Sequence, residues 1–120
     1  MSLRTCYAEL GGSLDSVLGR LPSERLVQKF VLKFLNEGSF CEMAAAVQAK
    51  DGEATFRAAH TMKGVCLNLS FDRLYASSNQ LCEAVRHGWT DEAAELFEIV
   101  VADYQQTVEA IQKFQTELES

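Results

Sequence analysis

The 120-residue sequence is poor in the residues and patterns that mark several protein classes. It has one proline and seven glycines, and no Gly-rich nucleotide loop, so we expect no kinase activity of its own. No Gly/Ser linker, charge block or internal repeat divides it. No apolar run approaches a membrane span, and residues 1–20 lack the pattern of a secretory signal. We therefore expect one domain over residues 1–120 of a cytoplasmic protein. The length and the initial Met1 favour a stand-alone protein, and a domain cut from a longer protein is the alternative.

Basic clusters are also absent. The chain has 11 Lys and Arg against 17 Asp and Glu, which gives a formal net charge of −6. Proteins that bind nucleic acid or an anionic membrane surface through charge need a basic patch. The scattered basic residues of this chain exclude both classes of partner.

The four cysteines have no C-x-x-C pair and no zinc-ligand spacing. A disulfide scaffold is not expected in a chain with this many apolar residues. We interpret them as small hydrophobic residues in a reducing compartment; they are Cys6, Cys41, Cys66 and Cys82.

Apolar residues recur every three or four positions along most of the chain, the spacing of amphipathic helices. The pattern predicts helices over residues 13–21, 24–36, 40–50, 53–69, from about 72 to 87, and from about 90 to 118. Ser23 and Thr90 are expected N-caps, and Gly88 is expected just after a helix C-terminus. The predicted fold is all-α: an antiparallel four-helix bundle with one or two short extra N-terminal helices.

One face of the 53–69 helix stands out. His60 lies opposite the predicted core stripe, which consists of Ala58, Met62, Val65, Cys66 and Leu69. Lys63 follows His60 by three residues, so its ammonium can reach a group attached to the imidazole. Gly64 follows by four and leaves a notch for the close approach of another molecule, at a cost of about 1 kcal/mol relative to alanine.

Phe56 and Leu67 bracket this face, and exposed apolar residues around a polar centre favour a docking surface. Each of them is alternatively an ordinary core residue, because a bundle helix buries a wide arc. Arg57 is either a docking residue or a solvated charge.

A neutral imidazole is a competent nucleophile that attacks phosphorus in line and leaves again readily. Such a transfer needs positioning and charge stabilisation. Lys63 supplies one positive charge. Because the sequence has no evident acidic cluster for magnesium, we expect no bound cofactor and expect Mg²⁺ to come from the partner.

The run His60-Thr61-Met62-Lys63-Gly64, followed by Asn68-Leu69 and Leu74, resembles the histidine-containing phosphotransfer (Hpt) family, whose signature is H-x-[LMI]-K-G on a bundle helix. The similarity extends to residues 56–59, 81–84 and the 30–35 segment, and covers roughly residues 13–115.

The resemblance implies that His60 is the phosphoacceptor, that Lys63 contacts the phosphoryl group and that Gly64 admits the partner. The partners it implies are the receiver domains of response regulators and of a hybrid histidine kinase, and the chain would work as a monomer and a phosphocarrier rather than an enzyme. Two positions depart from the family. Ser70 stands where glycine is common, and Cys82 falls near the register of a glutamine that supports the active histidine.

Two other functions compete with this one. A helical adaptor would bind receiver domains without carrying phosphate, and the cysteine near the glutamine register leaves room for it. A metal-binding bundle needs Glu-x-x-His pairs, and Arg57 and Ala84 stand where the glutamates would be. His87 is expected to have a structural role at the end of its helix.

Overall fold

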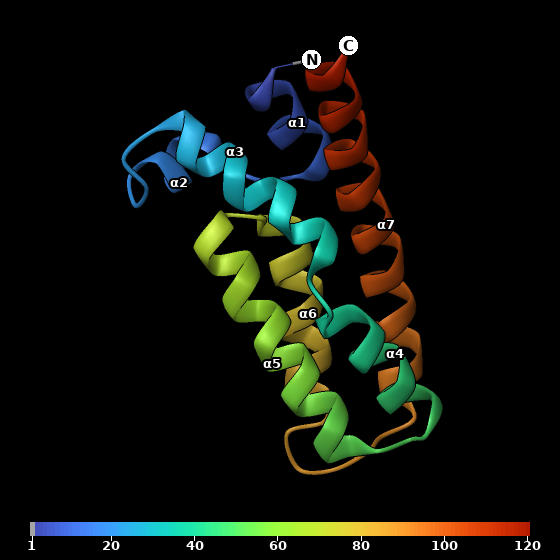
Figure 1. Cartoon of the computed structure of the whole chain (residues 1–120). Helices are drawn as coiled ribbons and strands as arrows, with labels where there is room; N and C mark the ends of the chain where they lie inside the picture. Colours follow the sequence, from blue (N-terminus) through green and yellow to red (C-terminus); the bar gives the residue numbers. More distant parts are fainter. Residues whose placement is uncertain (1) are drawn as a thin grey trace.

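Helices form nearly all of the regular structure in residues 2–120, which the computed structural model describes (Figure 1). They are α1 (Leu3–Leu10), α2 (Leu14–Leu18), α3 (Glu24–Lys33), the 3-10 turn η1 (Phe34–Asn36), α4 (Ser39–Gln48), α5 (Gly52–Leu69), α6 (Asp72–Ala84) and α7 (Glu92–Glu119). No strand occurs between residues 2 and 120, which confirms the all-α prediction. In the same range, no helix is long and apolar enough to cross a membrane.

The bundle consists of α4, α5, α6 and α7. Each of these helices packs against the next one in the sequence, and contacts between α4 and α7 close the ring. In Figure 1, α5 runs beside α6, and the long α7 forms the opposite edge. The helices α1, α2 and α3 gather at one end, where α1 packs along the C-terminal half of α7 and α3 crosses the end of α5. The four-helix bundle predicted from the sequence is confirmed.

The core joins the bundle to the N-terminal helices. The predicted inner face of α5 is buried at Ala58, Met62, Cys66 and Leu69, whereas Val65 is only half-buried. Aromatic rings continue the core towards the N-terminus: Phe71 contacts Phe34 at 5.2 Å and Tyr7 at 5.6 Å between ring centroids. Burial of this much apolar surface is what holds helices α1 to α3 against the bundle.

The short helix α1 is not predicted by the sequence pattern, in which the first helix spans residues 13–21. It begins at a Ser2 N-cap, whose hydroxyl accepts a hydrogen bond from the Thr5 amide. It ends at Gly11, whose φ of 81° is the left-handed conformation that glycine adopts without strain. Leu3, Cys6, Tyr7 and Leu10 form its buried side.

The connection between α6 and α7 corrects three expectations. Helix α6 ends at Ala84 rather than at residue 87, so Gly88, with φ 122°, belongs to the following loop and not to the helix end. Thr90 does not cap α7, which begins after Asp91. The Thr90 hydroxyl instead donates a hydrogen bond to the Ala84 carbonyl at 3.4 Å. Packing explains why α6 ends early, because the main chain at residues 88–89 must pass directly over Gly52 at the start of α5.

The C-terminus of α5 is tied to the N-terminal helices by side chains. Ser70 takes the left-handed conformation there, with φ 57°, in the place where glycine was expected from the family. Arg20 donates to the Leu67 carbonyl at 2.7 Å and to the Ser70 hydroxyl. The Tyr7 hydroxyl donates to the Leu69 carbonyl at 2.7 Å. Carbonyls that the helix cannot pair internally are thus satisfied by residues from outside the bundle.

Candidate functional site

His60 lies near the middle of α5, and its side chain is exposed. The helix is well anchored at its start, where the Asp51 carboxylate accepts a hydrogen bond from the Ala54 amide at 3.0 Å. Lys63 is half-buried and Gly64 exposed on the same outward face. The structure therefore places these three residues together, as the helical pattern predicted.

The imidazole of His60 has an aromatic neighbour on its own helix. The Phe56 ring lies one turn earlier and nearly parallel to it, with 6.0 Å between centroids and 12° between planes. The other support comes from the turn after α6, where the Arg86 guanidinium lies 5.4 Å from the centre of the Phe56 ring. Glu83 holds that guanidinium through two hydrogen bonds of 2.7 and 2.9 Å.

Arg86 and Glu83 were not singled out from the sequence. Their spacing of three residues is a recognisable helical ion pair, and Arg86 lies one turn beyond Cys82. The position of the Arg86 guanidinium on the Phe56 ring, however, depends on how α5 and α6 cross. The hydrogen bond from Arg86 holds the pKa of the Glu83 carboxyl below its usual value, and the charge of Lys63 contributes in the same direction.

Cys82 lies on the side of α6 that faces α5, as its register predicted, but its thiol is directed at the backbone of α5. The Sγ atom donates to the Phe56 carbonyl at 3.9 Å, the length of a weak S–H hydrogen bond. The residue is buried, and burial raises the pKa of its thiol. Cys82 therefore supports the Phe56 segment of α5 rather than the imidazole itself.

The three residues of α5 that were predicted to face a partner, Phe56, Gly64 and Leu67, differ in how exposed they are. A Cβ atom added at Gly64 would meet nothing within 4 Å, so the space above this glycine is open. Leu67 is 57% exposed. Phe56 is half-buried and packs against the core, which agrees with the core role that the sequence left open; its docking role stays a prediction.

Arg57 and His87 lie apart from these contacts. The Arg57 guanidinium donates to the Glu53 carboxylate at 2.8 Å in an exposed pair one turn apart. His87 is exposed in the loop after α6. It is not in the last turn of a helix, as had been expected, because α6 ends three residues earlier. Within residues 2–120, no three His, Cys, Asp or Glu side chains gather into a group that could hold a metal ion.

A family model for the Hpt domain matches residues 36–118, more than two thirds of the chain. The chain belongs to the Hpt domain family. Hpt domains are phosphocarriers without catalytic activity of their own, and they act with receiver domains in two-component signalling. No curated protein and no solved structure gives a significant match to this Hpt domain.

The matched range of the Hpt domain begins at the last residue of η1 and takes in α4 to α7. It therefore contains the whole bundle and every residue of the His60 face. Helices α1, α2 and α3 precede it, although they pack against the bundle and close the end of α5.

Proposed function

We propose that His60 accepts a phosphoryl group from the aspartate of one receiver domain and passes it to the aspartate of a response regulator. The observation that carries this proposal is the exposed imidazole in the middle of α5, with Lys63 and the open Gly64 position on the same face. The other histidine, His87, lies in a loop and lacks this setting.

The chemistry follows from these parts. A ring nitrogen of neutral His60 attacks the phosphorus of the receiver's aspartyl phosphate in line, an N–P bond forms, and the O–P bond breaks to release the carboxylate. The reverse step on a second receiver returns the nitrogen lone pair to the ring. Lys63 offsets the charge of the phosphoryl oxygens, and the receiver domain brings the Mg²⁺ ion. The Phe56 ring, with the Arg86 guanidinium on it, lies nearly parallel to the imidazole on one side of it.

The test is transfer from a phosphorylated receiver domain to the wild-type chain, to a His60→Gln variant and to a His87→Gln variant. His87 is the matched control because it is the other exposed histidine. We expect acid-labile, base-stable phosphate on the wild type and on His87→Gln, and none on His60→Gln. A wild-type chain that binds the receiver and gains no label would be an adaptor, and the phosphocarrier proposal would fail.

Lys63→Gln tests the charge contribution. We expect this variant to bind the receiver as the wild type does and to be labelled about tenfold more slowly, the effect of about 1.4 kcal/mol in the barrier. Equal labelling rates for Lys63→Gln and wild type would show that the ammonium does not act on the transferred group.

A further inference from the structure

The carboxylate of Glu83 neutralises a cation that lies beside the His60 site. Two N–H groups of Arg86 donate to its two oxygens, at 2.7 and 2.9 Å, while the same guanidinium lies 5.4 Å from the centre of the Phe56 ring. The hydrogen bond from Arg86 and the charge of Lys63 both hold the pKa of the Glu83 carboxyl below its usual value. Glu83 therefore acts electrostatically on both cations that flank the imidazole.

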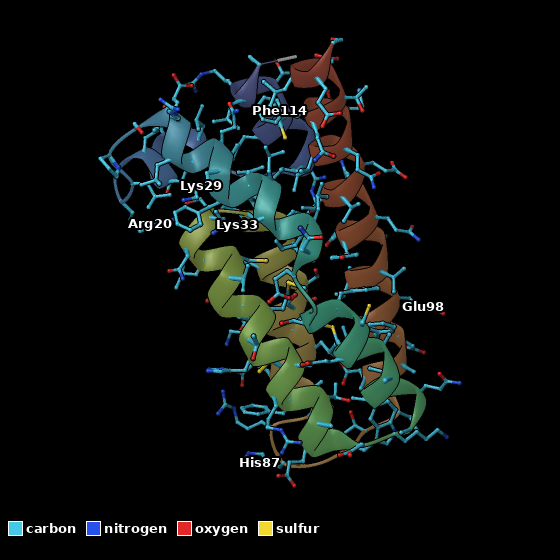
Figure 2. All side chains as sticks on the ribbon, viewed as in Figure 1. Arg20, Lys29, Lys33, His87, Glu98 and Phe114 are labelled. Carbon is cyan, nitrogen blue, oxygen red and sulfur yellow. The ribbon has the colours of Figure 1, made fainter. Side chains whose placement is uncertain are left out.

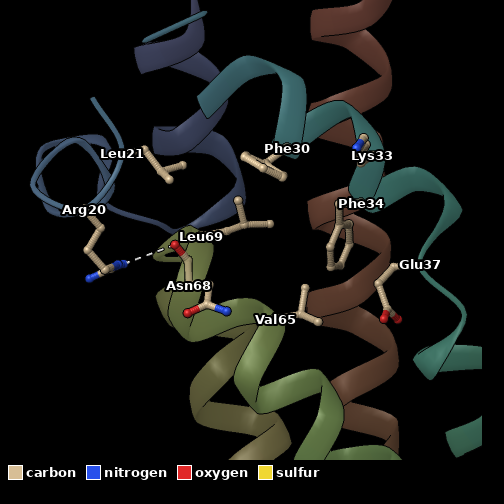
Figure 3. Close-up of a pocket in the computed structure, with 9 residues that line it drawn as sticks. All are labelled: Arg20, Leu21, Phe30, Lys33, Phe34, Glu37, Val65, Asn68 and Leu69. Atoms are coloured by element: carbon tan, nitrogen blue, oxygen red, sulfur yellow. Dashed lines mark hydrogen bonds between the residues drawn. The ribbon is translucent and has the colours of Figure 1, made fainter. Parts of the chain in front are cut away.

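Other basic side chains near α5 are engaged elsewhere. Figure 2 shows Arg20 and His87 at opposite ends of the bundle. Arg20 donates to main-chain carbonyls at the C-terminal end of α5 (Figure 3). The Arg57 guanidinium donates to Glu53, one turn farther from the imidazole. Arg86, in contrast, lies on the ring that is stacked next to the imidazole.

A phosphoryl group on His60 would compete with Glu83 for Arg86. Such a group carries a charge of about −1.5 to −2 and several strong acceptor oxygens, whereas a carboxylate carries a single charge. The planar guanidinium fork binds phosphate oxygens in the same bidentate way as it binds a carboxylate. The Glu83 and Arg86 side chains are 49% and 46% exposed, and exposed ion pairs contribute little to stability, so this pair is easily exchanged.

We propose that Arg86 passes from Glu83 to the phosphoryl group when His60 is phosphorylated, and that Glu83 is a positioning residue that holds the guanidinium back until then. This inference rests on the proposed phosphotransfer function. Because Arg86 lies on Phe56 in the unphosphorylated chain and leaves it in the exchange, the surface beside His60 differs between the two forms. A receiver domain then meets a covered ring on one form and an open ring on the other.

The test uses the full chain phosphorylated with phosphoramidate, which requires no receiver domain. A ring nitrogen of His60 attacks the phosphorus, the N–P bond of phosphoramidate breaks, and ammonia leaves with the proton that the ring gives up. A His60→Gln variant shows whether the label is on His60. Phosphorus NMR then follows the second ionisation of the phosphoryl group, at about pH 6, and nitrogen NMR follows the Nε–H group of Arg86.

Three single variants and one double variant are compared with the wild type. Glu83→Gln frees the guanidinium, Arg86→Gln removes it, and the double variant combines both changes. The matched control is Glu9→Gln, which takes a half-buried carboxylate from its ion pair with Lys113 between α1 and α7. It changes the net charge as Glu83→Gln does. Thermal unfolding confirms that each variant is folded.

Phosphorylation of the wild type should move the Arg86 Nε–H signal to its position in the phosphorylated Glu83→Gln variant. Glu83→Gln should lower the pKa of the phosphoryl group, with about a threefold lower affinity for its second proton, because Arg86 is then held by one anion only. Arg86→Gln should raise that pKa. In the double variant the Glu83 substitution should add little to the Arg86 substitution, since the carboxylate acts through the guanidinium. Glu9→Gln should behave as the wild type.

The outcomes separate this inference from the function on which it rests. Label on His60 with an unmoved Arg86 signal, or with the same phosphoryl pKa in Glu83→Gln and wild type, would overturn the exchange and leave the phosphocarrier intact. An equal effect of Glu83→Gln with and without Arg86 would also overturn it, because the carboxylate would then act by its own charge. If neither phosphoramidate nor a phosphorylated receiver labels His60, the proposed function fails and this inference fails with it.

Discussion

The two glycines of α5 should respond oppositely to the same substitution. Gly64 is exposed in mid-helix, where a Cβ would meet nothing within 4 Å. Gly52 is buried at the start of the helix, where a Cβ would collide with the main chain of Gly88 and Trp89. We expect Gly64→Ala to stabilise the protein and Gly52→Ala to destabilise it.

The size of each effect follows from the surroundings. Alanine is favoured over glycine in an exposed helix interior by about 1 kcal/mol, so Gly64→Ala should raise the free energy of unfolding by that amount. For a domain of this length that corresponds to a Tm about 4 °C higher. Gly52→Ala forces the loop away from the helix, and overpacking of this kind costs about 1–3 kcal/mol. Its Tm should fall by several degrees.

Thermal unfolding followed by circular dichroism measures both changes. The single tryptophan, Trp89, is half-buried beside Gly52 and reports locally through its fluorescence. Its emission should change in Gly52→Ala and stay as in the wild type in Gly64→Ala. A third variant, Gly64→Gln, fills the open space with a longer side chain and should slow phosphoryl transfer although its stability is not reduced.

A lower Tm for Gly64→Ala would refute the reasoning, because it would mean that the space over this position is occupied in the folded protein. Transfer to Gly64→Gln at the wild-type rate would refute the role of Gly64 in partner approach. Unfolding of Gly64→Gln would also count against that role, since it would make the glycine a packing requirement.

Three further predictions concern the surroundings of the site. Ser70→Ala should lower the free energy of unfolding by about 1 kcal/mol in denaturant titrations, because the hydrogen bond from Arg20 is lost. Ser70→Gly should lower it less, since glycine adopts the left-handed φ freely. At pH 8 a thiol reagent should modify one cysteine, the exposed Cys41, because burial raises the pKa of the other three thiols and shields them; in denaturant it should modify all four. Arg86→Gln should slow phosphoryl transfer about two- to fivefold in single-turnover measurements, because Phe56 loses the cation above its ring.

Sequence periodicity was sufficient for the helix that carries the site. Helix α5 was predicted over 53–69 and spans Gly52–Leu69, because a long stripe of core residues on one face leaves little freedom in its placement. The outward position of His60 relative to that stripe followed directly. The exposure of Gly64 and Leu67 was predictable for the same reason.

Contacts between helices could not be predicted in this way. The position of Arg86 over Phe56 depends on the crossing of α5 and α6 and on side-chain rotamers, neither of which leaves a periodic signal. The end of α6 at Ala84 depends on the passage of the loop over Gly52. Helix α1 has the right spacing, but eight residues are too short a run to stand out.

The hydrogen bonds that Arg20 and Tyr7 make at the end of α5 bear on how small this protein can be made. A fragment cut to the family-matched range 36–118 would keep His60 and lose both donors. The last carbonyls of the site helix would then face water, and the aromatic contacts of Phe71 with Phe34 and Tyr7 would go with the deleted segment. The smallest autonomous unit of this Hpt domain should therefore be larger than the segment that its family shares, and its N-terminal helices can diverge only where they do not hold α5.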